Sequence, residues 1–115
     1  MKSLSVQVQP ERSPGLDMAA LTTSFRALVV RIDLVRSHSF DTGDDNGAYY
    51  NFTFDTERSA ELWSLIQDTI FQAPEFHGYL AASAMAMCSS ESGWHQYSLL
   101  YHWDPEVPIV PVPAL

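Results

Sequence analysis

The chain has 115 residues, of which 46% are hydrophobic, and this composition predicts one globular domain with a single core. No stretch approaches the ~20 apolar residues of a membrane span, and the start lacks the basic-then-apolar pattern of a signal peptide, so we expect a cytoplasmic protein. The formal net charge of −8 disfavours direct contact with nucleic acid or with an anionic membrane surface.

The charge is distributed unevenly along the chain. Residues 1–36 hold five basic and three acidic residues, whereas residues 37–115 hold eleven acidic residues and a single basic one, Arg58. Most of the domain therefore carries one sign of charge, which favours a basic partner and a fast encounter with it. A simpler interpretation is that the carboxylates only keep the protein soluble.

The first third of the chain predicts one strand. Residues 1–15 are polar, but the alternation of Leu4, Val6 and Val8 fits either an edge strand or a flexible tail. Residues 25–36 show the cleanest alternation in the chain, which predicts a half-buried strand with Arg31 and Asp33 on its other side. Its apolar side consists of Leu28, Val30, Ile32 and Leu34.

A hairpin and a helix are predicted next. Residues 37–47 are expected to form a long loop, and residues 48–55 a strand that pairs with the preceding one and faces inward through Tyr50, Phe52 and Phe54. Asp55 or Thr56 then caps a helix that ends before Pro74. Its apolar stripe has helical spacing and consists of Leu62, Trp63, Ile66 and Ile70.

Residues 78–103 are expected to form a β-ribbon that turns across a loop at residues 89–93. One face of this ribbon is alanine-rich and the other is rich in aromatic residues and Met, so the second face needs cover from this chain, a second subunit or a partner. The complete prediction is an α+β fold with a single antiparallel sheet of about four strands, in the order β-β-α-β-β, and one main helix across one face. Residues 1–115 form one domain, with residues 105–115 as an extended Pro-rich tail containing the P-x-x-P spacing of Pro108 and Pro111.

No residue pattern supports catalysis, a metal site or a cofactor. The loop that starts at Asp41 is not an EF-hand, because Gly47 comes one place late and Phe52 occupies the position of the bidentate Glu. Cys88 and His102 would lie about 25 Å apart along the ribbon, too far for zinc or for a nucleophile and its base. The lone Cys88 reads as a small buried hydrophobe, and we expect no enzymatic activity.

Two functions remain. The first is a protein-binding module of the inhibitor, immunity or adaptor type, which presents carboxylates to a basic site on a partner such as a nucleic-acid-processing enzyme. Its predicted contacts are Asp41, Asp44, Asp45, Glu57, Glu61 and Asp68. The alternative is a homodimeric, barrel-like α+β protein that binds a small hydrophobic or aromatic ligand, with His95, His77 and Tyr79 as polar groups, and performs minor enzymatic chemistry. Its predicted interface consists of Met85, Met87, Tyr97, Leu99, Tyr101 and Trp103.

Overall fold

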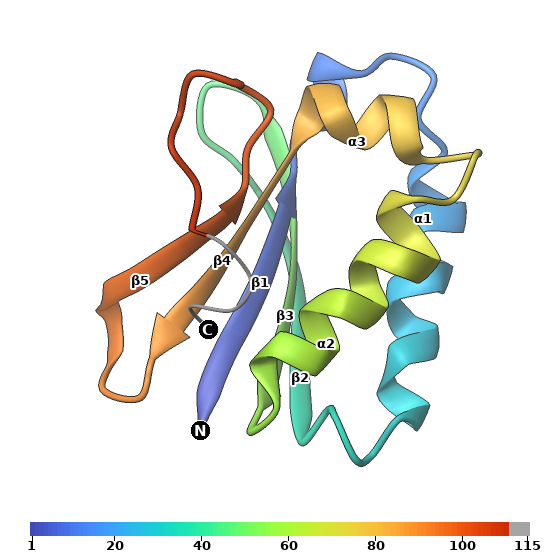
Figure 1. Ribbon diagram of the computed structural model, residues 1–115. Coiled ribbons are helices and arrows are strands. Elements are labelled where there is room, and N and C mark those ends of the chain that lie inside the picture. Colours follow the sequence, from blue (N-terminus) through green and yellow to red (C-terminus); the bar gives the residue numbers. More distant parts are fainter. Residues whose placement is uncertain (111–115) are drawn as a thin grey trace.

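The computed structural model describes residues 1–110 and consists of one antiparallel sheet with three α-helices against one of its faces (Figure 1). The strand order is β2-β3-β1-β4-β5. The strands are β1 (Lys2–Val8), β2 (Ser37–Asp44), β3 (Ala48–Thr56), β4 (Ala84–Ser90) and β5 (Gly93–Tyr101), and the helices are α1 (Met18–Ala27), α2 (Ser59–Ile66) and α3 (His77–Ser83). The predicted α+β class and single antiparallel sheet are confirmed, with one more strand and two more helices than expected.

β1 is the central strand of the sheet. It pairs with β3 on one side and with β4 on the other, so that Leu4 lies between Phe54 and Cys88. Leu4, Val6 and Val8 are fully buried on the side of the helices. The sequence left this segment open as an edge strand or a tail, but its three apolar side chains fill the middle of the core.

The strand that was predicted for residues 25–36 is not formed; this segment is the end of α1, a 3-10 turn over Leu28–Val30 and a loop. The carboxylate of Asp17 accepts a hydrogen bond from the Ala20 N–H at 3.0 Å and caps the helix. Leu21 and Phe25, four residues apart, are fully buried, and the Phe25 ring stacks on Phe52 at 4.3 Å. The alternation was misleading, because a 3-10 turn follows the helix and leaves Val30 and Ile32 77% exposed.

The predicted strand at residues 48–55 is confirmed as β3, but its hairpin partner is β2, which arises from residues expected to be a loop. Phe40 of β2 pairs with Phe52 and packs against it on the side of the helices, with ring centroids 5.2 Å apart. The strand has few apolar residues because it lies at the edge of the sheet, where most of its side chains are exposed. Because β2 has a polar composition, its sequence predicted a loop.

The predicted helix is confirmed as α2, which continues into a π-helical turn over Gln67–Phe71. Leu62, Ile66 and Ile70 are buried against the sheet, as their spacing indicated. Within the described residues, no helix has the length and apolar character needed to cross a membrane.

The ribbon expected over residues 78–103 is shorter than predicted. Its first part forms α3, and only β4 and β5 form the hairpin, with a turn at Glu91 and Ser92. Cys88 pairs with Ser98 and not with Trp94, because the register shifts between Ser89 and Ser90, next to the turn. The buried Ala84 and Ala86 leave room for the helical layer, as the alanine-rich face indicated.

Candidate functional site

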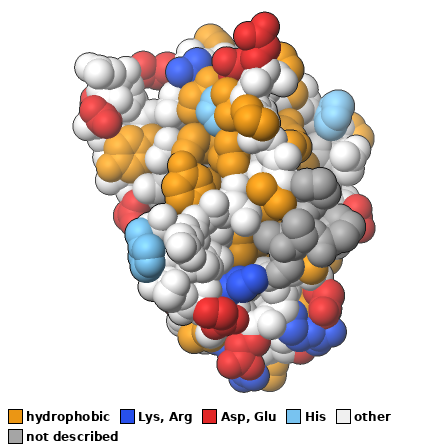
Figure 2. Space-filling view, turned by 60° about the vertical axis from the view of Figure 1, so that its left-hand side comes forward, with side chains coloured by type: hydrophobic (Ala, Val, Ile, Leu, Met, Phe, Trp, Pro, Cys, Tyr) orange, Lys and Arg blue, Asp and Glu red, His pale blue; other side chains and the backbone are white. Residues whose placement is uncertain are grey.

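The face of the sheet opposite the helices, here called the open face, is polar over β2, β3 and β1. Asp41, Asn51 and Gln7 lie side by side on it, because Asp41 pairs with Asn51 and Asn51 with Gln7. The open face becomes apolar over β4 and β5. Figure 2 brings that side of the molecule forward and shows hydrophobic side chains gathered there, with carboxylates around their rim.

Hydroxyl groups hold one end of the open face. The hydroxyls of Ser3 and Ser37 each donate to a different oxygen of the Asp55 carboxylate, both at 2.5 Å. The hydrogen bond from Ser3, followed by that from Ser37, lowers the pKa of Asp55. Two residue pairs further along, the hydroxyls of Ser5 and Thr53 are 2.9 Å apart. These bonds fix the three adjacent strands to one another.

A row of three amides crosses the other end of the open face, and we call it the amide row. The Arg12 Nε–H donates to Gln9 Oε1 at 2.7 Å, and Gln9 Nε2 donates to Gln7 Oε1 at 3.1 Å. Gln7 Nε2 donates to Asn51 Oδ1, and Asn51 Nδ2 donates to Asp41 Oδ1, both at 3.1 Å. The row therefore runs from a cation to an anion.

The two ends of the row determine the orientation of every amide within it. A guanidinium only donates and an ionised carboxylate only accepts, so each amide must present its oxygen towards Arg12 and its nitrogen towards Asp41. Each amide keeps one further N–H and one further lone pair for another partner. The row is thus a fixed set of donors and acceptors on an exposed surface.

A polar hollow of about 250 Å³ lies beside this row, at the turn between β2 and β3. It is lined by Gln7, Gln9, Asp45, Gly47, Tyr49 and Asn51. A smaller hollow of about 160 Å³ adjoins it and is lined by Gln9, Glu11, Arg12, Asn46, Gly47 and Ala48. Two residues belong to both, so the two hollows form one recess.

The turn that forms one wall of the recess is built by local sequence. Asn46 and Gly47 both have positive φ angles, of 58° and 139°, which Asn and Gly tolerate best. The Gly47 N–H donates to the Asp44 carboxylate at 3.3 Å. Across the hairpin the Tyr49 ring lies directly over Gly43, so a side chain at position 43 would displace the ring. In this position Tyr49 also lines the recess.

Three of the six predicted partner-binding carboxylates lie at this recess. Asp45 lines it, Asp44 holds its turn, and Asp41 ends the amide row; Glu11, which sequence reasoning missed, joins them. Within residues 1–110, none of these four carboxylates forms an ion pair with an Arg or Lys side chain. We call these four residues the acidic end.

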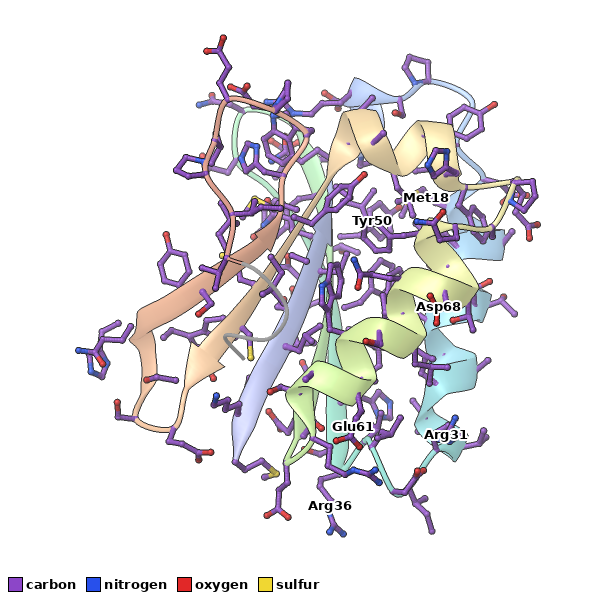
Figure 3. The ribbon with its side chains drawn as sticks, in the orientation of Figure 1. Met18, Arg31, Arg36, Tyr50, Glu61 and Asp68 are labelled. Carbon is purple, nitrogen blue, oxygen red and sulfur yellow. The ribbon has the colours of Figure 1, made fainter. Side chains whose placement is uncertain are left out.

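The other three predicted carboxylates lie elsewhere. Glu57 follows β3 at the opposite end of that strand and faces Arg36 at 3.7 Å, and Glu61 pairs with Arg58. Figure 3 shows Glu61 at the end of the molecule that carries Arg31 and Arg36, with Asp68 further along the helical layer. The structure thus does not bring the six predicted residues together, and two of them are already paired with arginines.

The predicted interface residues also divide. Met85, Met87, Tyr97 and Leu99 lie on the open face, where Tyr97 is 57% exposed. Tyr101 was expected beside them, but a bulge turns it towards the helices, where it contacts Phe71 at 4.7 Å and burial raises the pKa of its hydroxyl. Trp103 lies under the Arg12 guanidinium, 4.2 Å from its ring centroid, and so supports the amide row.

The polar groups expected around a ligand pocket are not brought together. His77 and Tyr79 belong to α3, which precedes β4, whereas His95 lies on β5 beyond the turn at the other end of β4. Within the described part of the chain, no three His, Cys, Asp or Glu side chains are placed to hold one metal ion.

Sequence reasoning missed Gln7, Gln9, Arg12, Asn51 and Tyr49. Three of them lie in the segment that was left open as a flexible tail, and amides carry no motif of their own. The one available signal was the alternation of Ser3, Ser5 and Gln7 with apolar neighbours, which is typical of a strand with one solvent-facing side.

No protein-family model matches this chain. A search of curated proteins finds no match either. Among solved structures, the chain is similar to a phage SAM lyase in complex with S-methyl-5'-thioadenosine, with 10% sequence identity, a TM-score of 0.48 and coverage of 88% of this chain and 89% of the lyase chain.

Proposed function

We propose that this protein binds another protein by accepting a basic segment of it at the acidic end. The observation that carries this proposal is the recess at the β2–β3 turn beside the amide row. Asp45 and Glu11 line it, Asp44 holds its turn and Asp41 ends the amide row, and none of these four carboxylates has an arginine or lysine partner within residues 1–110. The proposal keeps the inhibitor, immunity or adaptor role that the charge distribution favours and assigns the contact with the partner to one surface.

The recess has the chemistry that a guanidinium or ammonium group requires. Asp45 and Glu11 supply charge at its walls, and the amide oxygens each keep one free lone pair. Arg12 also lines the smaller hollow, but its guanidinium donates to Gln9 and lies over the Trp103 ring, and within residues 1–110 it forms no ion pair with these carboxylates. The net charge of −8 adds long-range attraction that speeds the encounter with a basic partner.

A nucleic-acid-processing enzyme presents a basic surface to phosphates, and the proposed partner carries a surface of this kind. Carboxylates spaced along a strand and a turn occupy such a surface by charge alone, without any catalytic group on this chain. The binder would then act as an inhibitor by occupying the site.

A titration with a capped hexa-arginine peptide in 50 mM salt tests the proposal. The triple variant D41N/D44N/D45N removes three charges from the acidic end, and the matched control E57Q/E61Q/D68N removes three charges elsewhere. Exposed ion pairs are worth about 0.2–1 kcal/mol each, so the loss of three should weaken binding by about 3- to 160-fold. The control should change it much less.

Two outcomes would contradict the proposal. Equal weakening by both triple variants would mean that only total charge matters and that the recess has no role. Binding that stays constant between 50 mM and 500 mM salt would exclude an electrostatic interface.

The alternative function, a homodimer formed through the open face, is favoured by the 57% exposure of Tyr97 beside Met87 and Leu99. Light scattering over a range of concentrations tests it. A dimer that dissociates in Tyr97→Glu supports the alternative, and a strict monomer removes it.

A further inference from the structure

The two edges of the sheet are built differently. At the β5 edge, the Val110 N–H donates to the Leu99 carbonyl at 2.8 Å, so the segment after β5 returns and covers part of this edge. Two bulges also interrupt the register between β4 and β5. Both features hinder the addition of another strand, because they disrupt or occupy the row of free backbone groups.

The β2 edge has none of these protections. Its eight residues pair with β3 in one continuous register from Ser37 to Asp44, without a bulge. The strand contains neither Pro nor Lys, the residues that commonly block edges. Within residues 1–110, no backbone hydrogen bond links β2 to any element beyond β3.

We infer that an extended segment of the basic partner adds to the sheet as a sixth strand beside β2. This inference rests on the proposed function, since that function supplies the basic partner, and it adds a second contact for that partner along the outer edge of β2, next to the recess. Backbone hydrogen bonds to β2 would supply affinity, while side chains on alternate positions would supply specificity.

The charge of the edge selects the occupant. Asp41 and Asp44 belong to β2 and Asp45 follows directly, so an approaching chain meets three carboxylates along one edge. A second copy of this protein would bring the same three carboxylates and would be repelled. A chain that carries Lys or Arg would be attracted.

The register of β2 also predicts the side chains of the added strand. Asp41 points to the open face, and Phe40 points to the helical side, where the Arg26 guanidinium lies 5.3 Å from its ring centroid. Neighbouring residues on adjacent strands share a face, so positions beside Asp41 favour Lys or Arg and positions beside Phe40 favour apolar or β-branched residues. The preferred segment therefore alternates basic and apolar residues.

Two capped ten-residue peptides test the inference by calorimetry in 50 mM salt. One alternates Lys and Val, and the other has the same composition with all five Lys before all five Val. Two further versions of the alternating peptide carry backbone N-methyl groups, either on every Lys or on every Val. Only one of these two sets of N–H groups points towards β2 in an added strand.

We expect the alternating peptide to bind at least about tenfold more tightly than the block peptide, and one methylated version to lose about 10- to 100-fold while the other stays within about threefold. Hydrogen exchange should slow at alternate amides of residues 37–44 and not in β5. These results together support strand addition.

The contrary outcomes separate this inference from the proposed function. If all four peptides bind equally and D41N/D44N/D45N weakens them all, the acidic end binds by charge alone, so strand addition is overturned and the proposed function stands. If no peptide binds, both are overturned. A dimer in the absence of peptide, with slowed exchange in β2, would show that a second copy occupies the edge and would also overturn the inference.

Discussion

The orientation of the amide row makes Gln7 the most informative residue to change. Gln7→Met keeps the length of the side chain but removes the hydrogen bonds to Asn51 and from Gln9, each 3.1 Å long. Two bonds at about 0.5–1.5 kcal/mol each give a loss of about 1–3 kcal/mol in the free energy of unfolding. The side chain is half-buried, so water can replace part of the lost bonding and the lower half of this range is expected.

Gln7→Glu tests the direction of the row as well as its existence. The new carboxylate still accepts from Gln9, but it faces the Asn51 oxygen, to which it cannot donate. Turning the Asn51 amide around would only bring its oxygen against Asp41. At neutral pH this variant should therefore be less stable than Gln7→Met.

The penalty of Gln7→Glu should depend on pH. The folded protein disfavours the new carboxylate, so its folded pKa is raised above its unfolded value of about 4.3. The penalty is therefore present above the folded pKa and disappears below the unfolded value, where the neutral carboxyl donates to Asn51.

Urea unfolding followed by tryptophan fluorescence, to which the buried Trp63 contributes, measures each free energy, with wild type compared at every pH. Gln96→Met on the exposed part of β5 is the control and should stay within about 0.5 kcal/mol. The reasoning about the row would be refuted if Gln7→Glu equalled wild type at pH 7, or if its deficit relative to Gln7→Met did not change with pH.

Three further predictions concern the fold and its titrating groups. Leu34→Ala should cost about 2–5 kcal/mol of unfolding free energy, because Leu34 is 4% exposed, whereas Ile32→Ala, at 77% exposed, should cost less than about 0.7 kcal/mol; equal losses in urea unfolding would support a strand at residues 25–36. The pKa of Asp55 is lowered in the folded state, so the stability it contributes is present above the unfolded pKa of about 3.9 and is lost as pH falls towards the lower folded pKa; the difference from Asp55→Asn should shrink as pH falls below about 4 in the same assay. Cys88 is 1% exposed, and burial also raises the pKa of its thiol, so iodoacetamide at pH 8 should modify it much more slowly in native protein than in urea, as mass spectrometry can measure.

The parts of the fold that could be predicted from the sequence are those where the hydrophobic pattern and the burial agree. β3 presents Phe52 and Phe54 to the core, and α2 presents Leu62 and Ile66, so alternation and helical spacing identified both correctly. The α+β class follows from these two elements together with the β4–β5 hairpin.

The errors arose where a periodic pattern was not caused by burial. Val30 and Ile32 continue an alternation that suggests a strand, but Asp17 caps a helix ahead of them and the chain turns before Arg36. β2 shows the reverse, because an edge strand with exposed faces needs no apolar alternation. Local sequence alone cannot distinguish an exposed apolar alternation from a buried one, or a polar edge strand from a loop, because the difference depends on which other segments pack against them.

The candidate site was predicted only in part, for a similar reason. The acidic loop at Asp44 and Asp45 was recognised from its charge, but the amides beside it come from β1 and β3, which are distant in sequence. Glu57 and Glu61 have the same charge as the loop residues and differ only in the arginines that folding places next to them.

The central position of β1 sets the order in which this protein must assemble. Leu4 leaves the ribosome well before its sheet neighbours Phe54 and Cys88, which follow much later in the sequence. β1 therefore remains incompletely paired, with its apolar side chains exposed, until β4 has been synthesised. Pairings between residues that are distant in sequence slow folding and prolong the exposure of apolar surface that can aggregate. The synthesis of β4, in the last third of the chain, therefore determines when β1 is protected from aggregation.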